Sequence, residues 1–476
     1  MIQPWRFGLD RLEDDVLETQ DRFEAYASAL ASVLGHVDRA GPLRDYCTGL
    51  MLPLERKSME PLAAATAPER VSAQHQSLMH FVSASPWSDE RLLAKVRELI
   101  LPTIERHGPI EAWIIDDTGF RKHGRHSVGV ARQYLGEIGK QDNCQVAVSL
   151  SVANAWASLP VAWRLYLPKE WAQDTARRKA AGVPDRIGFA TKPQIALEQI
   201  RWAVEAGLAP GVVLMDPGYG HDAALRAGVF ALGLSYVAGV QSGDLVFHPD
   251  ARIEPDRPSP RKGRRDEPDA VSIKEVALGL AASAWLQVEW REGTNARLSS
   301  RFARVRVYAA GRRPKGQTLP REWLLIEWPE GEAEPTKYWL STLPEDISFE
   351  RLVELAKLRW RIERDYHDLK QELGLDHFEG RSWRGFHHHA SLCIAAYGFL
   401  ISERETIPPS GPHSTGSGQK AGLPQNYRPR GAAYPAREAY PQLHRHPAKT
   451  VDRRSRPPTA AMSLLWPEAT LMTQYD

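Results

Sequence analysis

The chain lacks the features that usually mark membrane, secreted and zinc-binding proteins. Its 476 residues include only three cysteines, which lie far apart and form no Cys-x-x-Cys pair. This usage predicts buried thiols in a reducing compartment and argues against a zinc site or a disulfide framework. No apolar run approaches the ~20 residues that span a bilayer, and the first residues show no basic-then-apolar signal pattern. We therefore expect a cytoplasmic protein with no membrane partner.

The chain also lacks a large net charge. The formal net charge is only +2, so a nucleic-acid surface would have to come from local clusters of Lys and Arg. A hydrophobic content of 42% and a charged content of 25% are typical of a globular protein. A chain of this length exceeds one ordinary core, so several domains are expected.

The middle of the chain alternates between strand and helix patterns. Two continuous apolar runs predict buried strands, and two segments of alternating polarity between them predict antiparallel strands with one exposed face. Helical patterns precede and follow the second buried strand, and a short strand ends the series. The predicted strands are 112–116, 145–153, 161–167, 212–216 and 236–240. Three strands, a helix, a strand, a helix and a strand is the order of an RNase H-like core, a mixed sheet flanked by helices.

The segments around this core differ from it in character. Helical spacing dominates the N-terminal part, whereas strand-like runs follow a charged, proline-rich stretch after the fifth strand. The last part is rich in Pro, Gly, Ser, Arg and His without apolar periodicity, which predicts disorder. The predicted organisation is therefore 1–108, a helical N-terminal domain; 109–242, the first part of an α/β core; 243–343, a β-rich insertion; 344–405, the second part of the core; and 406–476, a basic tail.

Three acidic residues occupy positions that favour metal-dependent phosphoryl transfer. Asp116 and Asp216 each close a buried apolar run, and Glu363 lies in a strongly helical stretch. Each has an ordinary explanation by itself: a strand end, the first residue of a turn, and a solvated ion pair on a helix. Taken together, two carboxylates at strand ends and one on a helix can hold a pair of divalent ions. Such a pair clamps the attacking and leaving oxygens of the reaction.

The helical stretch around Glu363 supports this hypothesis. Its apolar residues recur at spacings of three and four and predict a buried stripe. Arg359, Glu363 and Lys370 form a second line beside that stripe, so the glutamate lies at the edge of the buried face. The flanking cations suit contact with phosphates. An ordinary ion pair between Arg359 and Glu363 is the alternative.

The residues around the three acids resemble those of a known family. The segments concerned are Ile115-Asp116-Asp117-Thr118-Gly119-Phe120, Met215-Asp216-Pro217-Gly218-Tyr219-Gly220, and Arg359 to Lys370. With them the chain resembles the DDE transposases of bacterial insertion sequences, particularly the insertion sequence 701 group. The resemblance implies an RNase H-like core, magnesium and a β insertion before Glu363. In related families a tyrosine stands where this chain has Ala356.

Several assignments stay open at the level of sequence. Asp116 is favoured over Asp117 as the first metal ligand, because Ile114 shares its strand face; Asp117 is the alternative. Beside Arg359 and Lys370, the candidate DNA contacts are Arg121, Lys122 and Arg381. The run His387-His388-His389 has no Cys or His partner at metal-binding spacing, so it predicts an exposed or DNA-facing cluster.

The function expected from these observations is DNA transposition. Asp116, Asp216 and Glu363 would hold two Mg²⁺ ions, for which Mn²⁺ could substitute. The partner would be double-stranded DNA, at the transposon ends and at the target, bound by a homodimer or larger assembly. The N-terminal helices are expected to bind the DNA ends. The alternatives are a catalytically decayed or domesticated DNA-binding protein, a metal-dependent nuclease without strand transfer, and a carboxylate enzyme acting on sugars.

Overall fold

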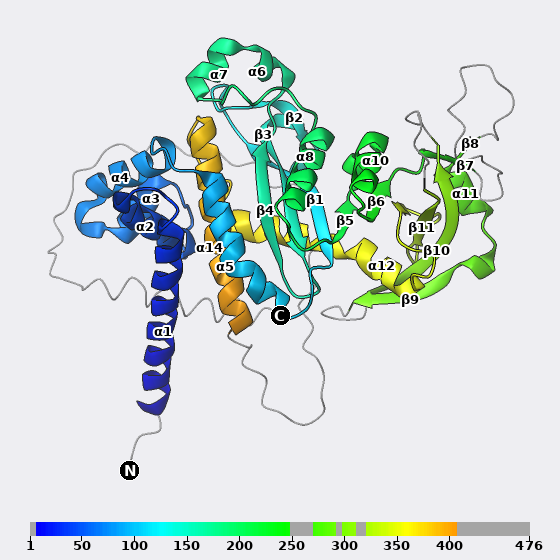
Figure 1. Cartoon of the computed structure of the whole chain (residues 1–476), viewed down its shortest axis with the longest axis horizontal. Helices are drawn as coiled ribbons and strands as arrows, with labels where there is room; N and C mark the ends of the chain where they lie inside the picture. The colour runs from blue at the N-terminus through cyan, green and yellow to red at the C-terminus, as the bar shows by residue number, and fades with distance from the viewer. Residues whose placement is uncertain (1–5, 248–269, 292–297, 311–319, 407–476) are drawn as a thin grey trace, which may run out of the picture.

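The protein is elongated, with a group of helices at one end, a sheet flanked by helices in the centre and a mainly β region at the other end (Figure 1). The computed structural model describes residues 6–247, 270–291, 298–310 and 320–406, and only the backbone for residues 6–16, 291, 405 and 406. The predicted tail beyond residue 406 lies outside the described residues. Within them, no helix is long and apolar enough to cross a membrane.

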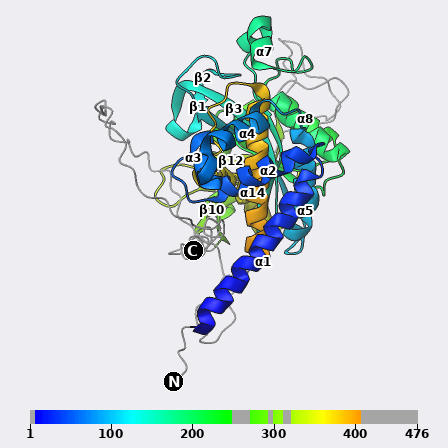
Figure 2. The same cartoon turned by 90° about the vertical axis from the view of Figure 1, so that its left-hand side faces the viewer.

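The N-terminal helices pack against a helix from the other end of the described chain. Their bounds are α1 (Arg6–Ala31), α2 (Ala40–Met51), α3 (Met59–Thr66), α4 (Val71–Ser83) and α5 (Asp89–Glu105). Helix α5 begins at Asp89, because the Ser88 hydroxyl accepts a hydrogen bond from the Arg91 amide at 3.2 Å. The partner helix, α14 (Trp383–Thr406), lies beside α5 in Figures 1 and 2. The Tyr26 hydroxyl donates to the Ala395 carbonyl at 2.8 Å, which ties the first helix to the last.

The central sheet contains antiparallel and parallel strands. Its core strands are β1 (Ala112–Arg121), β3 (Lys140–Ala153), β4 (Ser158–Leu165), β5 (Val212–Met215) and β6 (Tyr236–Val240), with the short β2 (Ala131–Leu135) beside β3. Strand β3 pairs antiparallel with β1, β2 and β4, whereas β5 pairs parallel with both β1 and β6. The predicted mixed sheet flanked by helices is therefore confirmed.

The first strand is longer than its sequence predicts. It was expected to end at Asp116, but pairing with β3 continues from Asp116 opposite Ser149 to Arg121 opposite Cys144. The extension is a tertiary effect, because β3 offers a hydrogen-bonding edge to polar residues that show no strand pattern by themselves. Asp116 therefore lies within a strand rather than at its end.

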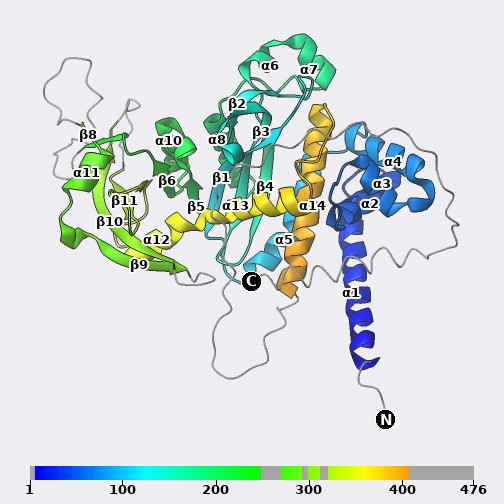
Figure 3. The same cartoon turned by 180° about the vertical axis from the view of Figure 1, so that it is seen from behind.

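Helices cover both faces of the sheet. Helix α8 (Lys192–Glu205) packs on β3, and α10 (Ala223–Ala231) packs against α8. The opposite face carries α12 (Phe349–Leu358) and α13 (Trp360–His367), as Figure 3 shows from behind. The shorter helices are α6 (Lys169–Gln173), α7 (Thr175–Ala181) and α9 (Pro217–Gly220).

The predicted β insertion continues the central sheet. Its elements are β7 (Leu245–Phe247), β8 (Ala270–Ser272), α11 (Ile273–Gly279), β9 (Leu286–Arg291), β10 (Leu298–Ala309), β11 (Glu322–Trp328) and β12 (Lys337–Ser341). Strand β12 pairs antiparallel with the core strand β6, placing Leu340 opposite Ala238. The region also has a small hydrophobic core of its own, to which Val246, Ile273 and Leu324 belong. Across the described residues the strands thus form one sheet, and the buried hydrophobic residues gather in three separate clusters.

The predicted helix around Glu363 is divided into three pieces. A break at Arg359 separates α12 from α13, and residues Asp368–Glu372 form a short π-helix. The predicted apolar stripe is largely buried; it comprises Leu355, Ile362, Tyr366, Leu369 and Leu373, with Leu358 partly exposed. Arg359 thus lies where the helix changes direction, and Glu363 follows one turn later.

Candidate active site

The two predicted aspartates lie on neighbouring strands. Strands β1 and β5 run parallel with Ile115 opposite Met215, so Asp116 and Asp216 follow at the same level of the sheet. The Asp216 carboxylate caps α9 by accepting a hydrogen bond from the Tyr219 amide at 3.0 Å. The Asp116 carboxylate accepts one from the Asp117 amide at 2.7 Å. The sheet therefore brings together two acids that are 100 residues apart in the chain.

Tight packing beside β6 fixes the turn that carries Asp216. A side chain at Gly220 would meet the Gly239 carbonyl oxygen at 2.0 Å, and one at Gly239 would meet the Pro217 ring at 2.8 Å. Only glycine allows α9 to approach β6 so closely. The segment from Asp216 to Gly220 is thus held against the sheet, which limits the positions open to the Asp216 carboxylate.

Arg359 links the third acid to the first. One guanidinium nitrogen donates to the Asp116 carboxylate at 2.7 Å, and the other donates to the Glu363 carboxylate one helical turn away. Burial disfavours the charge of this arginine, but Asp116, Glu363 and Asp216 together raise the pKa of Arg359 above its ordinary value. The guanidinium therefore stands among all three predicted acids.

The electrostatics of Asp116 indicate that these acids are crowded. Burial raises the pKa of Asp116 to about 7; Arg359 opposes this shift, while the charges of Asp216 and Asp117 add to it. Like charges held this close disfavour full ionisation unless positive charge is supplied. Arg359 supplies one positive charge, and a further cation at this site would stabilise the ionised carboxylates.

The donor set suits a hard divalent cation, although the three acids are not arranged around a common point. Carboxylate oxygens are the ligands that Mg²⁺ and Mn²⁺ prefer, and the mutual repulsion of Asp116 and Asp216 fits a cation between them. Within the described ranges, however, no three Asp, Glu, His or Cys side chains are close enough together to hold one ion. The Glu363 side chain is 55% exposed and turns to Arg359. It would have to leave that ion pair in order to join the aspartates.

Asp117 faces a different set of partners. The Lys192 ammonium lies 3.0 and 3.2 Å from its two carboxylate oxygens, and the Tyr219 hydroxyl donates to it at 2.9 Å. Both donors leave Asp117 better compensated than Asp116, which favours Asp116 as the metal ligand. The sequence patterns do not identify Lys192 or Tyr219 as partners of Asp117. The position of Lys192 beside Pro193 indicates the start of a helix. Nothing in the sequence indicates that this helix start lies next to β1.

The predicted DNA contacts fall into two groups. Lys370 is almost buried, because its ammonium donates to the Gly119 carbonyl at 2.9 Å. The Lys122 ammonium donates to the Phe378 carbonyl at 2.7 Å. Arg121 and Arg381 are exposed, and the guanidinium of Arg121 pairs with Asp142 at 2.8 Å. Lys370 and Lys122 thus hold the protein itself together, whereas Arg121 and Arg381 remain at the surface.

The prediction of an exposed histidine cluster is wrong. His387, His388 and His389 are all buried in α14, and their ring nitrogens lie within hydrogen-bonding distance of main-chain groups. Burial lowers the pKa of His387, and it lowers the pKa of His389 to about 4. The cause is the central place of α14, which contacts both the N-terminal helices and β4 and therefore has no free face at these positions.

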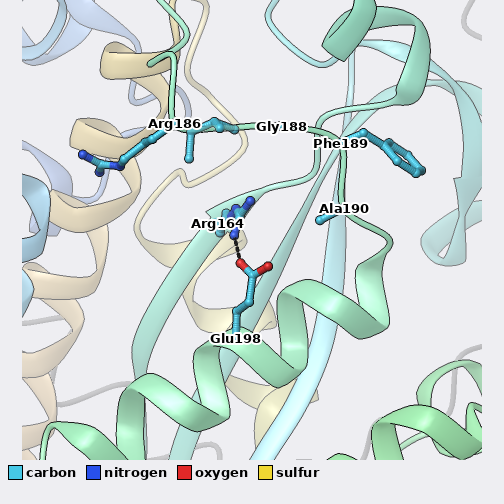
Figure 4. Close-up of a pocket in the computed structure, with 7 residues that line it drawn as sticks. Arg164, Arg186, Gly188, Phe189, Ala190 and Glu198 are labelled. Atoms are coloured by element: carbon cyan, nitrogen blue, oxygen red, sulfur yellow. Dashed lines mark hydrogen bonds and ion pairs between the residues drawn. The ribbon is translucent and has the colours of Figure 1, made fainter.

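A surface hollow of about 320 Å³ lies away from the three acids. It is bounded by α8 and the segment before it, and an ion pair between Arg164 and Glu198 crosses it (Figure 4). Phe189 borders the hollow with its ring turned away from that pair. The charges that line the hollow are paired, Arg164 with Glu198 and Arg186 with Glu90, and we assign it no catalytic role.

The chain is similar in sequence to known proteins. A family described as "DDE superfamily endonuclease" matches residues 29–297, a span that contains Asp116 and Asp216 and ends before Glu363. A protein of Microchaete diplosiphon named "Probable transposase for insertion sequence element IS701" is 32% identical over 199 residues. The aligned part covers 42% of this chain and 48% of that protein, so the chain matches about half the length of its curated relative.

Proposed function

Because the chain belongs to the DDE superfamily endonucleases, we propose that it is a DNA transposase. It would hydrolyse a phosphodiester at each end of its own element and join the freed 3′-hydroxyl to target DNA. The reaction would take place in the cytoplasm of a bacterium, where the DNA of an insertion sequence lies. The similarity to a probable transposase supports this proposal over that of a nuclease that only cuts.

The observation that carries the proposal is the link that Arg359 makes between Glu363 and Asp116, the strand neighbour of Asp216. Asp116 accepts from the Arg359 guanidinium at 2.7 Å, Glu363 accepts from the same group, and the charge of Asp216 acts on it. Arg359 pairs with Glu363 as neighbours one turn apart on a helix do, and its second bond, to Asp116 243 residues away, ties that pair to the strand of the buried aspartate. The strand order β4-β3-β1-β5-β6, with β5 and β6 parallel to β1, further supports an RNase H-like core around this point.

We assign the residues of the site the following roles. Asp116, Asp216 and Glu363 would hold two Mg²⁺ ions, replaceable by Mn²⁺, with Asp117 outside the ligand set. Bound ions of this kind activate water and neutralise charge on the phosphate. Arg359 would leave the carboxylates and turn its planar guanidinium to a phosphate, for which it has the right geometry. Asp117, held by Lys192 and Tyr219, would keep β1 in place beneath Asp116.

The remaining regions would serve DNA binding and assembly. We propose that the N-terminal helices bind the element ends. The insertion, residues 243–343, would lie beside the core. Both ends of an element must be held together for coordinated cutting, so at least a homodimer on DNA is required. Exposed Arg121 and Arg381 would add contacts to the DNA backbone. Such contacts make binding depend steeply on salt.

A cleavage and joining assay tests the proposal. Purified protein would be incubated with Mg²⁺, a labelled duplex carrying the boundary of the element, and a second unlabelled duplex. We expect nicking at the boundary followed by transfer of label to the second duplex. The Glu363→Gln variant should lose both products while still binding DNA. The matched control is Glu350→Gln, which removes an exposed glutamate on α12 and should behave as wild type.

The outcomes separate the alternatives. Cutting without joining would identify a nuclease, and binding without cutting would identify a decayed transposase. Full activity in the Glu363→Gln variant would remove the assignment of the third acid. Inverted repeats on both sides of the gene would support mobility independently of the assay.

A further inference from the structure

Positive charge is concentrated in two segments that lie at one end of the sheet. Residues 121–132 contain four Lys or Arg and no Asp or Glu, and residues 168–192 contain six Lys or Arg against three acids. Together they carry a net charge of +7, whereas the whole chain carries only +2. The rest of the protein is therefore slightly acidic, and the basic character of the molecule is local. This is the distribution expected of a nucleic-acid surface on a nearly neutral protein.

Specific contacts join the two segments into one structure. The Trp171 indole, buried in α6, donates to the Val130 carbonyl at 2.8 Å. The Arg177 guanidinium of α7 lies 3.8 Å from the centre of the Trp171 ring and donates to the Arg125 carbonyl at 3.1 Å. Helices α6 and α7 are thus fixed onto the loop between β1 and β2. We call this unit, residues 121–132 with 168–182, the cap.

The cap presents cations to solvent. Arg125, Lys169 and Lys179 are exposed, and among the described residues none of the three has an ion-pair partner. Arg177, by contrast, stacks on the Trp171 ring within the cap. Exposed, uncompensated cations on a rigid support contribute little to folding. They are suited to a polyanion.

The cap follows the proposed active site along strand β1. Strand β1 runs from Asp116 directly into the cap at Arg121, and Figures 1 and 3 draw α6 and α7 at the same end of the sheet as β2. Five residues of strand span about 17 Å, which corresponds to roughly five base pairs at 3.4 Å each. The ion pair between Lys192 and Asp117 also ties the segment that follows the cap to the strand of Asp116.

We propose that the cap binds the backbone of duplex DNA about five base pairs from the cut phosphate, with Arg125, Lys169 and Lys179 contacting phosphates. The inference rests on the proposed function, because it takes the three acids as the point of cutting. It adds a binding surface in the core, separate from the N-terminal helices. Contacts of this kind position the duplex without reading its sequence.

The test compares salt dependence in two matched triple variants. Arg125→Ser, Lys169→Ser and Lys179→Ser would be combined in one protein. The control would combine Arg201→Ser, Arg321→Ser and Lys337→Ser, which removes the same charge from exposed positions away from the cap and from the N-terminal helices. Affinity for a duplex of several helical turns would be measured by fluorescence anisotropy across a salt series. Thermal melting would confirm that both variants fold.

We expect the cap variant to lower the slope of log affinity against log salt by about 2 to 3, because each phosphate contact contributes about 0.9. The control should keep the wild-type slope. Two further element-end duplexes would be tested with the wild-type protein, each shortened to fewer than about five base pairs on one side of the cut. One of the two should reduce the wild-type slope to that of the cap variant, because it lacks the phosphates that the cap contacts. An unchanged slope in the cap variant, with wild-type protein binding and cutting normally, would overturn this inference alone. A wild-type protein that neither binds nor cuts would overturn the proposed function as well.

Discussion

Two regions of this protein bury ionisable groups, and they treat them differently. In the core between α13 and α14, Asp365 accepts hydrogen bonds from the Ser158 and Tyr397 hydroxyls at 2.5 and 2.9 Å, and His389 is held by Tyr46 and main-chain carbonyls. Neutral groups meet these side chains. At the edge of β1 and β5, by contrast, Asp116 faces the charges of Arg359, Asp216 and Asp117.

The contrast separates groups that serve folding from groups that serve chemistry. Burial raises the pKa of Asp365 to about 6 as it raises that of Asp116 to about 7, so a shifted pKa alone does not distinguish them. The two carboxylates differ in the groups that surround them. Asp365 accepts from neutral hydroxyls, and the like charge of Asp368 is a smaller contribution, whereas Asp116 accepts from a guanidinium and faces the like charges of Asp216 and Asp117. Clusters of like charge are more typical of functional sites than of structural ones.

The largest expected effect is on cutting. Replacing Asp216 by Asn removes one proposed ligand, and a metal contributes several kcal/mol of transition-state stabilisation. Cleavage should therefore fall by roughly a thousandfold or more. Melting temperature should stay the same or rise, because a repulsion is removed. A labelled-duplex assay and a thermal melt measure the two quantities. A variant that unfolds, with no specific loss of cutting in its folded fraction, would show that Asp216 serves folding as Asp365 does.

The next effect is on stability in acid. The pKa of His389 is about 4 in the folded protein against an ordinary value of 6.5, so the unfolded state binds more protons between these values. The stability due to the neutral ring is complete above pH 6.5 and is lost as the pH falls towards 4, by about 3 kcal/mol. Urea unfolding at a series of pH values checks this. In His389→Gln the dependence should be shallower by that amount, and identical slopes would contradict the assignment.

A smaller effect on stability is expected at Asp365. Its replacement by Ala leaves the Ser158 and Tyr397 hydroxyls buried without their acceptor, which should cost about 2 kcal/mol. Cutting per folded molecule should be unchanged, the opposite of the result for Asp216. Chemical denaturation and the cleavage assay at a temperature where the variant is folded give both values. Loss of activity in fully folded Asp365→Ala would blur the distinction between the two regions.

The smallest effect sharpens the choice between the adjacent aspartates. Lys192→Met frees Asp117 from its ion pair at 3.0 Å and should lower cleavage by roughly tenfold, as outer-shell changes near metal ligands do. Asp117→Asn should lower it by a similar factor and far less than Asp116→Asn. If the Asp117 variant were as inactive as the Asp116 variant, Asp117 would have to be placed in the ligand set.

Sequence patterns predict the parts of this fold that depend on local hydrophobicity. The apolar runs before Asp116 and Asp216 form buried strands as expected, and the stripe from Leu355 to Leu373 is buried as expected. The proximity of Asp116 and Asp216 was a hypothesis from their equivalent positions after these runs. The parallel pairing of β1 with β5 explains why that reasoning works.

Contacts between distant elements could not be predicted in the same way. The extension of β1 to Arg121 depends on β3, and the ion pair between Lys192 and Asp117 depends on how α8 packs. The histidine run reads as polar, yet α14 is enclosed on all sides at those residues. The ion pair of Arg359 with Asp116 was likewise not predicted, since the sequence supplied only the local pairing with Glu363.

The most direct test of the central claim is the number of Mn²⁺ ions bound per chain, measured by electron paramagnetic resonance in the presence of duplex DNA. The account predicts two ions in the wild-type protein and in Glu350→Gln. It predicts none at comparable affinity in a variant that combines Asp116→Asn with Asp216→Asn. Two ions bound with unchanged affinity in that double variant would show that these acids do not form the metal site.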